Sequence, residues 1–277
     1  MEIVVTGEAL RKKLLDLERP VVLVPTMGAF HEGHISLIRR ARLIAGAQGT
    51  VVVSIFVNPI QFDRPADLAA YPRPMDEDLA VCLREQVDLV FTPEAEAMYF
   101  SDRSVTVTES LLSRNLCGST RPGHFDGVCT VVLKLFLLTC CDVAVFGEKD
   151  FQQLAIVRRM VRDLDVPVKI ISSPTIREAD GLAMSSRNSR LNPEQRKAAP
   201  RIRKALLHAI TSTSPQEIIK SARDAIESSL LAKVDYLELV DAESLQRVKS
   251  LVKPAILAAA VYFDDVRLID HVNLDAR

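Results

Sequence analysis

The chain is 277 residues long, and its 35 Lys and Arg are balanced by 36 Asp and Glu, which leaves a formal net charge of −1. This balance argues against a general nucleic-acid or membrane-surface binder, because such proteins usually carry a basic excess. Hydrophobic residues make up 48% of the sequence, which excludes intrinsic disorder as the main state. A small polyanionic ligand held by a few local cations remains compatible with this composition.

The cysteines and the longest apolar stretch indicate the compartment. The 5 cysteines have neither a C-x-x-C pair nor a zinc-like spacing, so we expect small buried side chains in a reducing cytosol. No signal-peptide pattern is present at the N-terminus. The stretch Val128–Cys141 is interrupted by Lys134 and is too short to span a bilayer. We therefore expect a cytoplasmic protein with no membrane partner.

Short apolar runs rich in Val and Ile alternate with helical segments in the first part of the chain. The runs are continuously hydrophobic, which is typical of parallel strands buried on both faces. The predicted strands are Pro20–Pro25, Thr50–Val57, Val87–Thr92, Asp142–Phe146 and Val168–Ser172, with a weaker inserted strand at Ser104–Thr108. The predicted helices are His34–Ala45, Met75–Gln86, Gly127–Cys140 and Asp150–Leu164. This alternation predicts an α/β domain with a doubly wound parallel sheet.

The pattern changes after Arg177. A polar segment is followed by a charged helical stretch from Pro193, which Pro200 should kink or split, and by a second helix after Pro215. The predicted strands of this part are Val234–Val240, Ala255–Phe263 and Val266–Leu274. Helices followed by consecutive strands predict a smaller α+β domain. We place the domain boundary near residue 176, which gives domains 1–176 and 177–277.

The segment from Pro25 to His34 connects a buried strand to a helix, where open α/β sheets usually bind ligands. Gly28 and Gly33 permit close backbone approach, and the start of the helix favours an anion. His31 and His34 lie three residues apart and can converge on one ligand. The residues alone leave three readings open, namely structural histidines, metal ligands or phosphate contacts. The segment is not a Walker A sequence or a zinc H-E-x-x-H pair.

Two further candidates carry charge. At the end of a predicted strand, Lys149 can reach a phosphate and Asp150 can accept hydrogen bonds from ribose hydroxyls, although Asp150 could equally be a helix N-cap. At the proposed domain junction, Ser185 and Arg187 suit a polyphosphate, and a plain Ser-rich linker is the alternative. Of the two glutamines after Asp150, one should face back toward the ligand crevice.

A polar cluster follows the second predicted strand. Asn58 and Gln61 can hydrogen-bond a small polar substrate, although turn residues are the commoner explanation. The loop Arg121–Phe125 carries charged residues immediately before an apolar helix. Because no nucleophile–base arrangement is recognisable, these candidates point to chemistry by positioning and charge stabilisation of a bound polyphosphate.

Six stretches in order resemble the pantoate–β-alanine ligases (pantothenate synthetases), within the HxGH nucleotidyltransferase-like superfamily. They run from Pro25 to Asn188 and read PTMGAFHEGH, FVNPIQF, YPRPMDEDL, RPGHFDGV, VFGEKDFQQL and PTIREADGLAMSSRN. The resemblance implies a Rossmann-like ATP-binding domain, a smaller lid domain and a homodimer. It also implies that ATP, pantoate and β-alanine give pantothenate, AMP and pyrophosphate through an enzyme-bound pantoyl adenylate, with Mg²⁺.

The resemblance also implies roles for residues of this chain. The catalytic positions are His31, His34, Lys149 and Arg187. The ATP-binding positions are Met27, His34, Gly147, Lys149, Asp150, Ile176, Met184, Ser185 and Arg187. Asn58, Gln61 and Gln153 match the pantoate-binding positions, and Asp78 is the expected Mg²⁺ ligand.

The chain departs from the family pattern at Asp126, at Cys140-Cys141, at Phe151 and at Pro200. None of these positions belongs to the residues assigned to chemistry. Two other functions compete with the ligase. An adenylyltransferase would share the HxGH segment but not NPIQF or GEKDFQQL, and a catalytically inactive nucleotide-binding regulator would not need both histidines, Lys149 and Arg187.

Overall fold

The computed structural model describes residues 1–15 and 17–276, which form two compact units. The first unit comprises Met1–Glu109, Pro122–Glu148 and Ile156–Pro174. The second comprises Ser110–Arg121, Lys149–Ala155 and Thr175–Arg277. Each unit has its own sheet and is described on its own. The predicted domains 1–176 and 177–277 remain a proposal about how the chain divides.

The first unit is built on a six-stranded sheet in the order β1-β4-β3-β2-β5-β6, and all neighbouring strands are parallel. The strands are β1 (Glu2–Val4), β2 (Val21–Thr26), β3 (Thr50–Ile55), β4 (Leu89–Phe91), β5 (Val143–Gly147) and β6 (Lys169–Ser173). The five predicted strands of the parallel sheet are thus confirmed. The three-residue strand β1 was not predicted, because it is too short to give a hydrophobic pattern.

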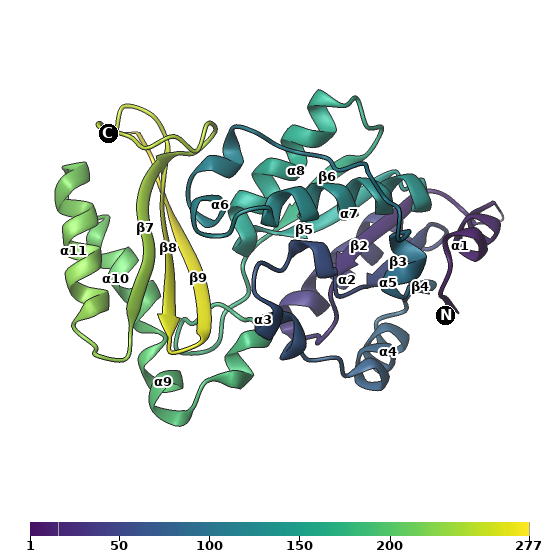
Figure 1. The fold of residues 1–277 in the computed structure, drawn as a ribbon, viewed down its shortest axis with the longest axis horizontal. Helices are drawn as coiled ribbons and strands as arrows, with labels where there is room; N and C mark the ends of the chain where they lie inside the picture. Colours follow the sequence, from purple (N-terminus) through teal and green to yellow (C-terminus); the bar gives the residue numbers. More distant parts are fainter. Residues whose placement is uncertain (16, 277) are drawn as a thin grey trace. The chain divides into compact units, whose positions relative to one another are not determined.

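Helices cover the sheet of the first unit (Figure 1). The longer ones are α1 (Gly7–Leu14), α2 (Glu32–Ala45), α4 (Met75–Arg84), α7 (His124–Thr139) and α8 (Phe151–Asp163), whose first residues group with the second unit. Short helical segments are η1 (Pro59–Gln61), α3 (Pro65–Ala69) and α5 (Ala95–Met98). All four helices predicted for this part of the chain are confirmed, whereas α1 was not predicted.

The continuous apolar runs are buried on both faces of the sheet, as the pattern predicted. Val22 and Val24 of β2 pack with Ile38 of α2 in one core cluster, and Leu23 between them points to the opposite face. All four of these side chains are completely buried. The sequence order of the strands reverses between β2 and β5, and ligands bind doubly wound sheets at such a point.

The expected strand at Ser104–Thr108 is wrong. Among the described residues this segment belongs to neither sheet, and Val105 is 78% exposed. The alternating Val and Thr residues fit a strand, but a strand also needs an edge to pair with. Instead, the Val107 N–H donates to the hydroxyl of Thr130 in α7 at 3.0 Å.

The second unit carries an antiparallel sheet in the order β7-β8-β9. Its strands are β7 (Lys233–Asp241), β8 (Ala255–Phe263) and β9 (Val266–Leu274), as predicted. The helices and short helical segments of this unit are η2 (Leu112–Arg114), α6 (Cys117–Thr120), η3 (Glu148–Asp150), η4 (Ser186–Arg190), α9 (Pro193–Ala198), α10 (Arg201–Ala209) and α11 (Pro215–Glu227), with η3 starting at the end of the first unit. The smaller α+β architecture is confirmed.

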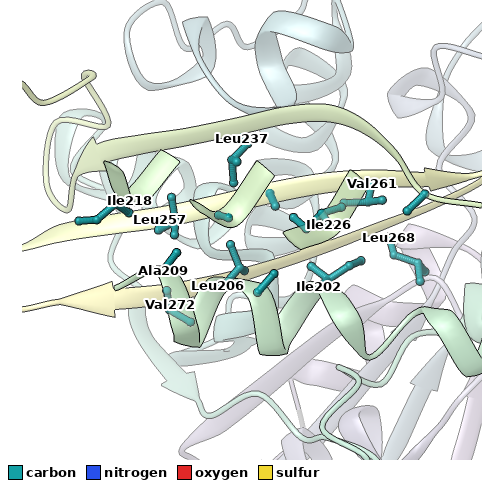
Figure 2. Packing of buried hydrophobic residues seen from close by; sticks show 14 of the residues in the cluster. Ile202, Leu206, Ala209, Ile218, Ile226, Leu237, Leu257, Val261, Leu268 and Val272 are labelled. Carbon is teal, nitrogen blue, oxygen red and sulfur yellow. The ribbon is translucent and has the colours of Figure 1, made fainter. Parts of the chain in front are cut away.

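One hydrophobic core holds the second unit together. Figure 2 shows Ile202 and Leu206 of α10 pointing toward Leu257 and Val261 of β8, and all four belong to one buried cluster. The helical spacing of apolar residues in α10 supplies this stripe. Pro200 separates α9 from α10 and stands at the N-cap of α10, so the expected split of the helix is confirmed.

Gln152 ties together the two short mid-chain segments of the second unit, residues 110–121 and 149–155. Its side-chain amide donates to the carbonyl oxygens of Leu112 and Asn115 at 2.9 and 2.7 Å, and it accepts from the Cys117 N–H at 2.9 Å. Gln152 is 5% exposed. Its polar atoms thus stabilise the loop at residues 110–121.

The cysteines are all free, and four of the five are buried. Burial raises the pKa of Cys82 and of Cys129 to about 12, so neither thiol is activated as a nucleophile. Cys140 is exposed, which the sequence reading did not anticipate. No helix in the described part of the chain combines the length and apolar composition that crossing a membrane requires.

We expect Leu206→Ala to lower the free energy of unfolding of the second unit by about 2–5 kcal/mol, because Leu206 is completely buried and the change leaves a cavity. The adjacent Leu207 is 45% exposed and is the matched control, so Leu207→Ala should change stability by less than about 0.5 kcal/mol. Urea unfolding followed by circular dichroism measures both. Equal midpoints for the two variants would contradict the assigned core.

Candidate active site

The turn after β2 carries the first part of the candidate site. Gly28 and Ala29 both have positive φ, at 80° and 54°, so the chain reverses sharply before α2. A side chain at Gly28 would also place its Cβ 2.8 Å from Oδ2 of Asp78. Both the backbone angle and the close contact therefore require glycine at this position.

Asp78 of α4 anchors this turn. Its Oδ2 accepts the Ala29 N–H and its Oδ1 accepts the Phe30 N–H, both at 2.7 Å. The side chain is 2% exposed. Burial raises the pKa of Asp78, and the two backbone hydrogen bonds act in the opposite direction.

His31 and His34 cap the start of α2. Nδ1 of His31 accepts the Gly33 N–H at 3.1 Å, and Nδ1 of His34 accepts the His31 N–H at 3.4 Å. Because an accepting Nδ1 carries no proton, the neutral rings are protonated at Nε2. The ring centroids lie 4.2 Å apart. Two adjacent Nε2–H donors suit the oxygens of a phosphate, whereas a metal ligand would need the Nε2 lone pair. The geometry therefore argues against metal ligands, while the capping contacts fit structural histidines and the Nε2–H groups fit phosphate contacts.

Asn58 and Gln61, after β3, contact each other directly. Asn58 Nδ2 donates to Gln61 Oε1 at 2.9 Å, and Gln61 Nε2 lies 3.1 Å from the sulfur of Met27. Asn58 is 1% exposed and Gln61 is 9% exposed. Met27, Asn58 and Gln61 therefore form one group at the carboxyl ends of β2 and β3, which pair in register.

A pocket of about 350 Å³ opens in the first unit at the carboxyl ends of β3 and β4. Met27 and Gly28 form part of its wall, and Asp78 contributes to its lining. Gly147, the remaining candidate of this unit, ends β5, and a Cβ there would meet only Leu37 at 4.0 Å. Crowding does not explain a glycine at that position.

In the second unit, Lys149 and Asp150 start the chain toward α8. Their Nζ and Oδ1 atoms lie 3.6 Å apart, and the side chains are 21% and 48% exposed. The proposed contacts of these residues with phosphate and ribose remain predictions. The side-chain amide of Gln152 is hydrogen-bonded within the second unit. Of the two glutamines, Gln153 therefore remains the candidate for substrate binding.

The other candidates of the second unit lie on one folded loop. Met184 N–H donates to the carbonyl of Ile176 at 3.0 Å, and Arg177 pairs with Ala183 in an isolated bridge. Ser185 caps η4 by accepting the Arg187 N–H at 3.2 Å. These contacts bring Ile176 and Met184 together and fix Ser185 directly before Arg187. The loop is therefore a defined structure and not a featureless Ser-rich linker.

The sequence reading missed two residues that support this site. Tyr99 donates its hydroxyl to Asn58 Oδ1 at 2.8 Å, and a Cβ on Gly127 would lie 2.5 Å from the Ile60 carbonyl. No sequence pattern links Tyr99 to Asn58, because Asn58 follows β3 whereas Tyr99 comes after β4. Gly127 lies in an apolar helix, where a glycine is unfavourable and can indicate close packing.

The residues that the structure describes offer no cluster of ligands for a metal ion. Asp78 already accepts a backbone N–H on each oxygen, and the described residues contain no group of three His, Cys, Asp or Glu that could hold a metal. The assignment of Asp78 to Mg²⁺ therefore remains a prediction that this geometry does not support.

The comparisons with known proteins agree with the motifs. A family model described as pantoate-beta-alanine ligase matches residues 2–273. The chain belongs to the pantoate–β-alanine ligase family. Pantothenate synthetase of Akkermansia muciniphila is 52% identical over 276 residues, covering 97% of this chain and 98% of that protein. Pantothenate synthetase of Desulfovibrio desulfuricans is 50% identical over 262 residues, covering 92% and 91%.

Solved structures of the family share the fold. The crystal structure of pantothenate synthetase from Thermus thermophilus matches with a TM-score of 0.91 at 42% identity, covering 98% of this chain and 99% of that chain. Pantoate–β-alanine ligase from Francisella tularensis, complexed with β,γ-ATP and β-alanine, matches with a TM-score of 0.82 at 32% identity, covering 98% and 97%. The Rossmann-like architecture with a smaller antiparallel domain is therefore that of the ligase family.

We expect Asp78→Asn to destabilise the turn before α2 by about 1–3 kcal/mol, because an amide nitrogen would replace one of two buried acceptor oxygens. Asp76→Asn, at an exposed position of the same helix, is the matched control. Thermal unfolding and ligase activity at increasing Mg²⁺ measure the effect. If Asp78→Asn instead kept full stability and only raised the Mg²⁺ requirement, Asp78 would be a metal ligand and not an anchor.

Proposed function

We propose that this chain ligates pantoate and β-alanine to pantothenate in an ATP-dependent reaction with two steps. A pantoate carboxylate oxygen attacks the α-phosphorus of ATP, the bond to pyrophosphate breaks, and pantoyl adenylate stays bound. The amine of β-alanine then attacks the acyl carbon, loses a proton and displaces AMP. The observation that supports this proposal is the pair of histidines capping α2, whose Nδ1 contacts leave an Nε2–H donor on each ring, in a chain of the ligase family.

Charge stabilisation is the main task of the protein in the first step. Negative charge grows on the departing pyrophosphate, and donors fixed beforehand stabilise it without reorganising. We assign this role to His31, His34, Lys149 and Arg187. Ser185 and its neighbouring loop would close over the phosphates, which also protects the mixed anhydride from water.

The remaining candidates position the substrates. In this proposal Met27, Ile176 and Met184 flank the nucleotide, and Gly147 with Asp150 contacts the ribose. Gln61 and Gln153 bind pantoate, whereas the buried Asn58, which the resemblance also assigns to pantoate, acts by holding Gln61. The amide groups suit this substrate because its hydroxyl and carboxylate oxygens need uncharged donors and acceptors at fixed positions. Mg²⁺ would neutralise negative charge on the phosphates of ATP, and we assign no residue of this chain to it.

We expect His34→Ala and Lys149→Ala each to slow formation of pantoyl adenylate about 100-fold or more, because each removes a donor fixed toward the developing charge. Single-turnover reactions with ATP and pantoate, without β-alanine, isolate this step. The exposed His208 provides a matched control, and His208→Ala should react at the unaltered rate. Adenylate formation at a normal rate in both variants would contradict the assigned roles, and AMP transfer to a nucleotide acceptor would contradict the ligase.

We also propose that the chain is a cytoplasmic homodimer. The five free cysteines suit a reducing compartment. The extended segment Ser104–Thr108 carries exposed Val105 and could pair with the same segment of a second copy, which would complete the strand that its sequence favours.

Val105→Lys should therefore shift the protein toward monomer, because a charge would be placed on the pairing segment. Light scattering coupled to size exclusion measures the mass. Lys220→Ala, at an exposed helical position of the second unit, is the control and should leave the mass unchanged. A monomeric mass for the unaltered protein would contradict the dimer, and a dimer unaffected by Val105→Lys would place its interface elsewhere.

A further inference from the structure

Three hydrogen bonds link Tyr99, Asn58, Gly127 and Gln61 in a small network. Tyr99 OH contacts Asn58 Oδ1 at 2.8 Å, and Asn58 Nδ2 contacts Gln61 Oε1 at 2.9 Å. Asn58 Nδ2 also contacts the Gly127 carbonyl oxygen at 3.1 Å. Since Asn58 is 1% exposed, these contacts satisfy an amide that water does not reach.

The carbonyl oxygen of Gly127 determines the donor and the acceptor in each of these hydrogen bonds. A backbone carbonyl oxygen only accepts, so the side of Asn58 that faces Gly127 is the NH2 group. The second hydrogen of that NH2 group then donates to Gln61, whose facing atom is consequently Oε1. The opposite side of Asn58 is its oxygen, so Tyr99 donates to it.

Several contacts hold Tyr99 in this role. Arg103 and Lys134 lie over its ring, at 5.5 and 5.6 Å from the centroid. Lys134 also donates to the Met98 carbonyl, next to Tyr99 in the chain. Burial raises the pKa of the Tyr99 phenol, so the hydroxyl keeps its proton over the whole working pH range.

The result is a fixed orientation of the Gln61 amide. With Oε1 held by Asn58, the NH2 end faces Met27, whose thioether sulfur is a weak acceptor. The backbone of Gln61 is held as well, because its carbonyl accepts from His124 Nδ1 at 2.7 Å. An oxygen-rich substrate would offer this NH2 group a stronger partner than sulfur.

We propose that Tyr99 is a positioning residue for the hydroxy acid substrate, because its hydroxyl fixes Asn58 and thereby presents the Gln61 NH2 group as a donor to a substrate oxygen. This inference rests on the proposed assignment of Gln61 to pantoate. Tyr99 itself touches no substrate. Without its hydroxyl, the buried Asn58 oxygen lacks its donor, and the amide no longer holds Gln61 in one orientation.

The test is Tyr99→Phe, with steady-state kinetics measured for each substrate in turn. We expect KM for pantoate to rise about tenfold and KM for ATP to stay within about twofold. Tyr236→Phe is the matched control, because Tyr236 is also buried and its hydroxyl lies 3.3 Å from Cys117 Sγ in the second unit. It should leave KM for pantoate unchanged. A uniform fall in activity, with no change in KM for pantoate, would overturn the proposal.

A double-mutant cycle separates positioning from general destabilisation. In the Gln61→Ala background, Tyr99→Phe should have no further effect on KM for pantoate, because the group it positions is gone. Additive effects would overturn the proposal. If Tyr99→Phe does not fold, Asn58→Asp interrupts the same network one bond further on, and a pantoate KM at the wild-type value would then overturn it.

The same experiment distinguishes failure of the two proposals. If Gln61→Ala alone leaves KM for pantoate unchanged, the assignment of Gln61 is wrong. If Gln61→Ala raises that KM and Tyr99→Phe does not, only the positioning role of Tyr99 is wrong.

Discussion

The buried carboxylate of Asp78 holds the turn on which the first unit's part of the site depends. Two backbone N–H groups of that turn have no partner in the sheet or in α2, and both donate to Asp78. A buried N–H without an acceptor is costly, so the carboxylate determines one conformation of the turn. That conformation sets where α2 begins, and His31 and His34 cap this start through Nδ1. The protonated Nε2 atoms follow from the cap.

Buried hydrogen bonds also fix the side chains of Asn58 and Gln152. Asn58 is fixed by Tyr99 and Gly127, and Gln152 is fixed by three backbone groups of residues 110–121. In each case a side-chain amide is oriented by backbone groups that can only donate or only accept. Amides oriented in this way either present a defined donor to a substrate, as we propose for Gln61, or close a loop. The uncharged residues of the site thus depend on the backbone around them as closely as the charged ones.

Secondary structure was predictable where a segment's own pattern decides it. The continuous Val and Ile runs of β2 and β3 need no partner to be recognised, because burial on both faces makes every position apolar. Pro200 splits its helix for a local steric reason. Ser104–Thr108 shows the limit, since its alternation is that of a strand but pairing depends on an edge elsewhere in the fold. The three-residue β1 is recognised only in the structure, by its parallel pairing with β4.

The sequence by itself determined the family, the parallel sheet and the motif positions, because short-range patterns and residue order carry that information. The tertiary structure decided what the polar side chains do. It showed that Gln152 is used within its own unit, that Asp78 anchors a turn, and that Tyr99 contacts Asn58 across 41 positions of the chain. Such roles depend on which donor faces which acceptor after folding. Partners distant in the chain leave no local signal, so only the folded structure identifies them.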